Sequence, residues 1–185
     1  MKRKLTARDI SYIAMGVALI ALCSWLSVPM TVPFTMQTFA VCLIAALFGL
    51  RGGLWTVVCY LLLGAAGAPV FAGFGGGFAA LLGPTGGYLL GFVFTALAVG
   101  FAADRLGRRP QVLIPAMAVG VLLCYAFGTA WFMWVYAKNS GPIGLGTALA
   151  WCVLPYLIPD AAKIALAAML TGRLRPLLYR EGWTE

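Results

Sequence analysis

The sequence contains no histidine, and only 10% of its 185 residues are charged. Histidine is the commonest general base in enzymes and the commonest protein metal ligand, so its absence argues against hydrolase and metal-site chemistry. The five cysteines form no Cys-x-x-Cys pair, and we expect them to behave as small buried apolar side chains. We therefore expect no metal, no cofactor and no enzymatic activity.

Charge is scarce because apolar residues dominate the chain. Hydrophobic residues make up 63% of the sequence, and the mean hydropathy is +0.97. A soluble domain is about half apolar and about a quarter charged, so the composition predicts an all-α integral membrane protein. At roughly 20 residues per span, the chain has room for about six transmembrane helices. We expect residues 1–185 to form a single membrane-embedded domain.

Proline, glycine and arginine divide the apolar sequence into spans. The expected spans are 10–28, 38–50, 54–68, 85–103, 111–136 and 159–178. Arg51-Gly52-Gly53 is typical of a tight turn between the second and third spans. Pro155 and Pro159 interrupt the last apolar stretch. Residues 144–152 are therefore expected to form a short helix at the outer surface, with one long kinked helix over the whole stretch as the alternative.

The distribution of basic residues predicts the orientation in the membrane. With six spans and a cytoplasmic N-terminus, Lys138 lies outside, Lys163 lies within a span, and the other basic residues lie inside. These are Lys2, Arg3, Lys4, Arg8, Arg51, Arg105, Arg108, Arg109, Arg173, Arg175 and Arg180. The positive-inside bias therefore favours both termini in the cytoplasm, in the cytoplasmic membrane. No basic patch alternates with aromatics, so we expect no nucleic-acid partner, and Asp104 among its arginines is expected to be a solvated turn.

Two loops on the predicted outer face, residues 29–37 and 69–84, contain no charged residue. Such loops are either ordinary connections or a lid over a mostly apolar ligand cavity. Glycine allows the close backbone approach that a lid needs, and irregular backbone is tolerated at membrane depth where it lines a cavity. No Walker A lysine follows the glycines, so we expect any energy that the protein uses to come from a gradient or a partner.

Asp160 and Lys163 are charged residues between apolar flanks, away from the cytoplasmic end of the last span. At positions i and i+3 of a helix they share one face. A charge inside a span costs about 2.5–3.5 kcal/mol on insertion scales, so such residues usually pair and line a site. The pair is either a structural salt bridge or a donor and an acceptor for a ligand that offers an N–H beside a C=O.

Ala14 and Ala18 form a small-xxx-small pair on the first span, a pattern that allows helices to approach closely. The pair fits either internal packing or contact with another protein.

Four motifs in register resemble the BioY family, the biotin-binding S components of energy-coupling factor (ECF) transporters. They are Val32-Pro-Phe-Thr-Met-Gln-Thr38, Gly67-Ala-Pro-Val-Phe71, Gly83-Pro-Thr-Gly-Gly-Tyr88 and Pro159-Asp-Ala-Ala-Lys163. The resemblance implies the six-helix S-component fold, with outer loops that close over biotin. It also implies that Asp160 and Lys163 contact the ligand. Family members usually carry a polar residue among the glycines between the third and fourth spans, whereas residues 73–78 are wholly apolar here, so we assign no contact there.

The resemblance further implies partners: a transmembrane coupling protein and two cytoplasmic ATPases. It favours Ala14 and Ala18 as the surface that meets this module. Whether the chain works alone or only with such a module stays open.

For biotin itself, we hypothesise that Asp160 accepts a ureido N–H and that Lys163 donates to the ureido oxygen. The carboxylate would then meet loop backbone or the side chains of Thr35, Gln37 or Tyr88. An S component for a different vitamin and a small intramembrane enzyme are the alternatives. The enzyme would need a second catalytic group beside Asp160 and Lys163.

Overall fold

The computed structural model describes residues 6–180 and their side chains through Pro176. Lys2, Arg3 and Lys4 of the predicted cytoplasmic cluster lie outside the described residues. The larger helices are α1 (Ala7–Trp25), α2 (Gln37–Ala65), α4 (Gly86–Arg105), α5 (Pro110–Ser140) and α7 (Leu157–Arg180). The shorter elements are β1 (Ser27–Val28), β2 (Phe34–Thr35), η1 (Ala72–Phe74), α3 (Phe78–Leu82), α6 (Leu145–Cys152) and η2 (Leu154–Tyr156).

Local sequence explains several of the helix boundaries. Thr6 and Asp9 form a capping box at the start of α1, in which each side chain binds the backbone N–H of the other residue. Pro110 stands in the first turn of α5, where its missing N–H leaves no hydrogen bond unmade. Gly141 ends the same helix with a φ of +96°, a conformation that glycine adopts without strain.

α2 is two antiparallel arms rather than one continuous helix. Gly49 has a φ of +70° and a ψ of −169°, which no helix contains. In a straight helix the 23 steps from Gln37 to Tyr60 would span about 34 Å. In the structure Gln37 Nε2 lies 2.5 Å from the Tyr60 hydroxyl, so the chain reverses at Gly49. The two arms are the predicted second and third spans, and the reversal falls just before the predicted turn.

Asp104 is exposed at the end of α4, as the sequence suggested, and it also closes this reversal. Its Oδ2 accepts the Leu50 N–H at 2.8 Å, and its Oδ1 lies 3.1 Å from a guanidinium nitrogen of Arg108. Arg108 also donates through Nε to the Ala46 carbonyl at 2.9 Å. A Cβ on Gly49 would lie 2.2 Å from Asp104 Oδ1, so glycine is required both for its φ and for this contact.

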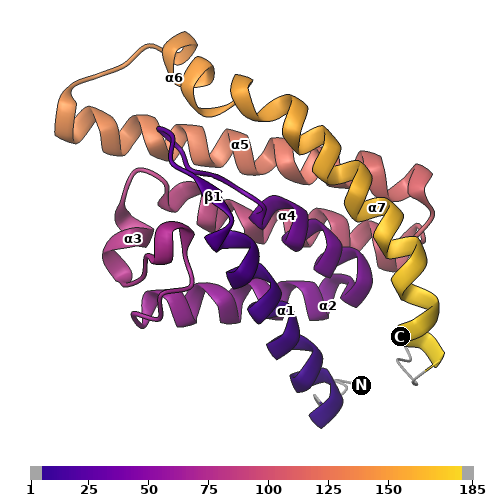
Figure 1. The fold of residues 1–185 in the computed structure, drawn as a ribbon. Coiled ribbons are helices and arrows are strands. Elements are labelled where there is room, and N and C mark those ends of the chain that lie inside the picture. The colour runs from indigo at the N-terminus through magenta and orange to yellow at the C-terminus, as the bar shows by residue number, and fades with distance from the viewer. Residues whose placement is uncertain (1–5, 181–185) are drawn as a thin grey trace.

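The core forms where α4 packs between α2 and α5, with α7 against α2 and α5 (Figure 1). Small residues bring α4 and α5 close together. A Cβ on Gly91 would lie 2.8 Å from Cys124 Sγ, and one on Gly120 would lie 3.0 Å from the Thr95 Cα. The Thr95 hydroxyl donates to the Gly120 carbonyl at 2.9 Å across the same contact. Such close approach by small residues is how membrane helices gain packing energy in lipid.

Within residues 6–180, five helical segments are long and apolar enough to cross a membrane, and one of them, α2, consists of two arms. The fold is therefore that of an all-helical membrane protein with six main helices in the described part of the chain. α6 is a separate short helix, because Val153, with a φ of −126°, leaves the helical conformation and so ends α6 before η2 and α7 begin. This agrees with the short helix expected at 144–152 rather than with the one long helix. α1 begins and α7 ends on the same side of the molecule, whereas the β1 hairpin, α3 and α6 gather on the other (Figure 1).

Candidate functional site

A cavity of about 160 Å³ lies among the β1–β2 hairpin, the η1 loop and the inward faces of α2, α4, α5 and α7. Its wall is mostly apolar and aromatic, with a few polar groups, as is typical of small-molecule sites. All five residues expected to contact a ligand line this one cavity: Thr35, Gln37, Tyr88, Asp160 and Lys163. The structure thus brings together residues from three separate parts of the chain, and their contact with a ligand stays a prediction.

Asp160 and Lys163 form a buried ion pair in the first two turns of α7. Lys163 Nζ lies 2.7 Å from Asp160 Oδ1. Asp160 is only 4% exposed and Lys163 only 5%. Lys163 also donates to the Thr35 carbonyl at 2.7 Å and lies 4.0 Å above the centre of the Phe34 ring. The Tyr125 hydroxyl donates to the other carboxylate oxygen of Asp160. The charges are thus neutralised within the cavity wall, as charges at membrane depth must be.

This pair keeps capacity for a ligand. An ammonium group has three N–H donors, and the described residues occupy two of those on Lys163. Each carboxylate oxygen of Asp160 has received one donor and can accept a second. The pair can therefore present an acceptor and a donor side by side to one polar group of a ligand.

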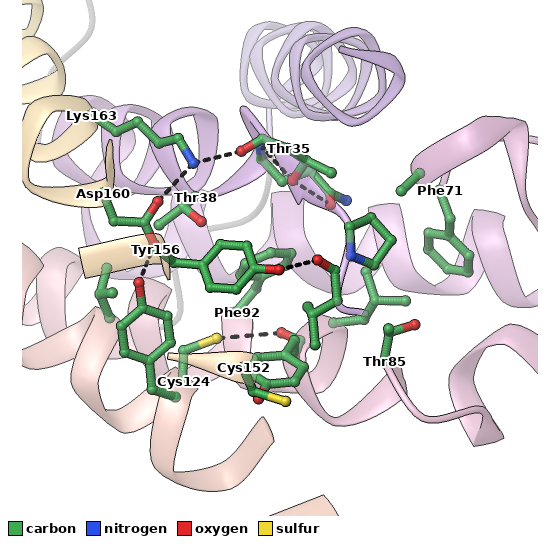
Figure 2. Close-up of a pocket in the computed structure, with 18 of the residues that line it drawn as sticks. Thr35, Thr38, Phe71, Thr85, Phe92, Cys124, Cys152, Tyr156, Asp160 and Lys163 are labelled. Carbon is green, nitrogen blue, oxygen red and sulfur yellow. Dashed lines mark hydrogen bonds and ion pairs between the residues drawn. The ribbon is translucent and has the colours of Figure 1, made fainter. Parts of the chain in front are cut away.

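The first covering element is the hairpin of β1 and β2, which the sequence suggested only as a charge-free loop. Its strands pair Ser27 with Thr35 and Val28 with Phe34. The Tyr156 hydroxyl donates to the Val32 carbonyl in the loop between the strands. Together with the Lys163 bond to Thr35, this fastens the hairpin to the α7 side of the cavity (Figure 2).

The second covering element is the glycine-rich loop at η1. Phe71 is 3% exposed and lines the cavity, and a Cβ on Gly64 would lie 2.0 Å from its ring. The Val70 carbonyl accepts hydrogen bonds from the Ser24 hydroxyl at 2.6 Å and the Tyr60 hydroxyl at 2.9 Å. The Trp25 indole donates to the preceding carbonyl, that of Pro69, at 2.8 Å. The loop is therefore ordered over the cavity without using a charged group.

Tyr88 stands on the first turn of α4 and forms another part of the wall. Its hydroxyl lies 2.9 Å from the Thr129 hydroxyl of α5. Its ring packs on Gly128, where a Cβ would lie only 2.3 Å from the ring. Tyr88 can therefore offer a hydroxyl to the ligand from a fixed position.

The sequence analysis missed two tyrosines at the charged end of the cavity. Tyr125 lies in the middle of α5 and Tyr156 in η2, and both line the cavity. Each lies in an apolar stretch in which aromatic residues are common, so composition alone did not distinguish it. The signal that could have found Tyr125 is its depth in a span, where a hydroxyl needs a polar partner.

Ala14 and Ala18 lie elsewhere, on the exposed face of α1. Gly16 and Val17 of the same helix are buried, and a Cβ on Gly16 would lie 2.8 Å from the Thr56 side chain. The interpretation of the alanine pair as an internal packing contact is therefore wrong, because α1 packs against α2 through its other face. The alanines form part of an open surface of the molecule.

The sequence and the six-helix architecture were compared with those of known proteins. The model of the BioY family matches residues 1–180. The chain belongs to the BioY family. It is similar to the biotin transporter BioY of Thermotoga maritima, with 38% identity over 86% of this chain and 91% of that protein. It is also 35% identical to a probable biotin transporter BioY of Pyrococcus horikoshii, over 91% of this chain and 97% of that protein.

A solved structure shares the fold of this BioY-family chain. It is a crystal structure of the S component for biotin from an ECF-type ABC transporter. The two superpose with a TM-score of 0.83 at 27% sequence identity, covering 95% of each chain. The S-component fold expected from the sequence is thereby confirmed.

Proposed function

We propose that this chain captures biotin in the cavity between the hairpin and the η1 loop, as the substrate-binding S component of an ECF-type transporter. The observation that carries the proposal is the convergence of Thr35, Gln37, Tyr88, Asp160 and Lys163 on one cavity in a BioY-family fold. The family is one of transporter subunits, which argues against an intramembrane enzyme. The names of the relatives favour biotin over another vitamin. We infer that residues 1–185 act as one membrane-embedded binding domain.

Biotin has a ureido head, an apolar fused ring and an aliphatic chain that ends in a carboxylate. Figure 2 shows Asp160 and Lys163 at one end of the cavity and Phe71 and Thr85 at the other. Because Asp160 and Lys163 share one face of α7, they serve the same end of an extended ligand. The ureido head binds there, with its N–H donated to Asp160 and its oxygen accepting from the spare N–H of Lys163. The carboxylate is met by Gln37, Thr35, Tyr88 or loop backbone.

Titration calorimetry of biotin into detergent-purified protein tests the proposal. Wild type should bind biotin, and Asp160→Asn should bind it far more weakly because the ureido acceptor and the partner of Lys163 are both changed. A panel of other vitamins separates biotin from the alternative ligands. Absence of heat with biotin in the wild type would contradict the function while leaving the fold unaffected.

A carboxylate-modified ligand tests the assignment of the head group. Lys163→Met should weaken biotin and biotin amide to the same extent, since the ureido head is common to both. If Lys163→Met instead bound biotin with unchanged affinity and discriminated less against the amide, Lys163 would serve the carboxylate.

The orientation we propose places the cavity towards the outside and both termini in the cytoplasm. Support comes from the exposed Arg51, Arg105 and Arg109 near the α2 reversal, and from Lys138 near the opposite end of α5. A membrane-impermeant maleimide should label Asn139→Cys on intact cells and leave Leu106→Cys unlabelled. The reverse pattern would contradict this orientation.

We also propose that transport needs a transmembrane coupling protein and two cytoplasmic ATPases, which meet the surface around Ala14 and Ala18. No Walker A sequence is present in the chain, so ATP hydrolysis must come from such a partner. Co-purification of the chain with a coupling protein and its ATPases tests this arrangement. Biotin uptake by the chain expressed alone, at the rate of the full assembly, would contradict it.

A further inference from the structure

A chain of hydrogen bonds connects the two elements that cover the cavity. The Thr35 hydroxyl lies 3.0 Å from Gln37 Oε1, and Gln37 Nε2 lies 2.5 Å from the Tyr60 hydroxyl. The Tyr60 hydroxyl in turn lies 2.9 Å from the Val70 carbonyl. Thr35 belongs to the hairpin and Val70 leads into the η1 loop, and Tyr60, in the second arm of α2, joins them through Gln37. Tyr60 is fully buried.

Chemistry fixes the direction of every bond in this chain. A carbonyl oxygen only accepts, so the single hydroxyl proton of Tyr60 is donated to Val70. Tyr60 must then accept from Gln37, which means that the amide nitrogen, and not the amide oxygen, faces Tyr60. Gln37 Oε1 consequently faces Thr35, whose hydroxyl proton is donated to it. The orientation of the Gln37 amide is thus set by the Val70 carbonyl, through Tyr60.

This orientation decides what the cavity offers at Gln37. The amide nitrogen carries two N–H groups, and Tyr60 takes one of them. Gln37 lines the cavity, so its second N–H is the donor available to a ligand acceptor. Thr35 also lines the cavity, but its hydroxyl proton is already donated to Gln37 Oε1. Gln37, rather than Thr35, is therefore the side chain that can donate a hydrogen bond to the ligand.

We propose that Tyr60 is a positioning residue for ligand selection: it orients Gln37 so that an amide N–H meets the carboxylate of the ligand. This inference rests on the proposed function and assigns its carboxylate end. Tyr60 itself is not among the described residues that line the cavity. Its ring packs edge-on against Phe71 with centroids 5.5 Å apart, which holds the hydroxyl in place. Its influence on the ligand therefore passes through Gln37.

The test compares biotin with biotin amide, whose terminal group is neutral and carries its own N–H donors. Titration calorimetry on the detergent-purified protein gives both affinities for the wild type and for Tyr60→Phe. Without the Tyr60 hydroxyl, Gln37 loses its fixed acceptor and the amide can turn. The preference for biotin over its amide should fall by about tenfold, the value of one hydrogen bond to a charged group. Affinity for the amide should change little.

Trp25→Phe is the matched control, because the Trp25 indole also holds the η1 loop, through the Pro69 carbonyl, but has no hydrogen bond to Tyr60 or Gln37. It should leave the ratio of the two affinities unchanged. An equal loss of both ligands in Tyr60→Phe would show that Tyr60 only supports the fold, and would overturn the inference. If Tyr60→Phe fails to fold, Gln37→Glu replaces it. Glutamate has no N–H to offer, so an unchanged ratio in that variant would overturn the inference as well.

The wild-type titration separates this inference from the proposed function. Wild-type protein that binds biotin, with an unchanged ratio in the variants, overturns the role of Tyr60 alone. Wild-type protein that binds neither ligand overturns the proposed function, and this inference with it.

Discussion

The Tyr125 hydroxyl donates to one carboxylate oxygen of Asp160 from the facing helix α5. Lys163 occupies the other oxygen at 2.7 Å, so the carboxylate is held from two sides. A buried carboxylate with both oxygens engaged has one fixed orientation, which is what recognition of a planar ureido group requires. Tyr125 thus supports the candidate site without being one of the residues that its charge pattern revealed.

Tyr125→Phe should therefore weaken biotin binding while preserving the fold. Loss of a hydrogen bond to a charged group costs about 1.5–3 kcal/mol, so an affinity loss of about tenfold or more is expected by titration calorimetry. Tyr136→Phe is the matched control, since Tyr136 lies on the same helix but is not among the described residues lining the cavity. Equal affinities in the two variants would show that Tyr125 does not support the site.

The ion pair of Asp160 and Lys163 should show strong energetic coupling. Asp160→Asn alone leaves a buried ammonium without its counter-charge, and Lys163→Met alone leaves a buried carboxylate. Each single change should reduce stability by about 3–5 kcal/mol, whereas the double variant should recover much of that loss. Thermal unfolding in detergent measures the stability, and all three variants should still bind biotin weakly.

Lys138→Met is the control for the removal of a lysine charge, because Lys138 is exposed and lies over the Trp134 ring at 3.6 Å. It should change stability by less than about 1 kcal/mol. If the double variant lost as much stability as the sum of the two single changes, the pair would not be coupled.

The sequence predicted the helical membrane fold and the charged end of the site because both depend on rare residues. In so apolar a chain, each charge must either mark a loop or belong to a site, and Asp160 and Lys163 follow that rule. Asp104 is exposed, as its neighbours along the chain suggested, but its hydrogen bond to the backbone of α2 could not be predicted. Its partner, the Leu50 N–H, lies 54 residues away, and only the reversal at Gly49 brings the two together.

The hydroxyl groups of the site could not be assigned from the sequence for a related reason. Tyr60, Tyr125 and Tyr156 lie in apolar stretches, and their roles depend on which carbonyl or carboxylate faces each hydroxyl. Those partners are 10, 35 and 124 residues distant in the sequence, respectively. Helix packing, rather than local pattern, decides such pairs.

Gly64→Ala should disturb the η1 loop by displacing the ring of Phe71. A Cβ there would lie 2.0 Å from the Phe71 ring, so the ring must leave its place in the cavity wall. We expect faster biotin dissociation in a chase with unlabelled ligand. Gly172→Ala in α7 is the control, because a Cβ there meets no atom within 4 Å and alanine favours a helix by about 1 kcal/mol. Dissociation at the wild-type rate in Gly64→Ala would show that Phe71 does not retain the ligand.

Ala14 and Ala18 should matter for transport and not for binding. Both are exposed on α1 and are not among the described residues that line the cavity. Replacing both with leucine would overpack the contact with the coupling protein that we propose there, at a cost of about 1–3 kcal/mol per site. Because neither alanine is among these lining residues, titration of biotin in detergent should give the wild-type affinity. Uptake of labelled biotin by cells that also contain a coupling module should fall about tenfold or more.

Ala126→Leu distinguishes a partner surface from lipid contact in general. Ala126 is also exposed, but it lies on α5, and a leucine facing lipid costs nothing in packing. Uptake should remain at the wild-type level in this variant. Equal loss of uptake in Ala126→Leu and in the α1 variant would mean that the Ala14 and Ala18 surface is no more important for uptake than a lipid-facing surface. Equal loss of binding and uptake in the α1 variant would mean that α1 supports the cavity. Only loss of uptake confined to the α1 variant, with binding intact, supports a coupling surface at Ala14 and Ala18.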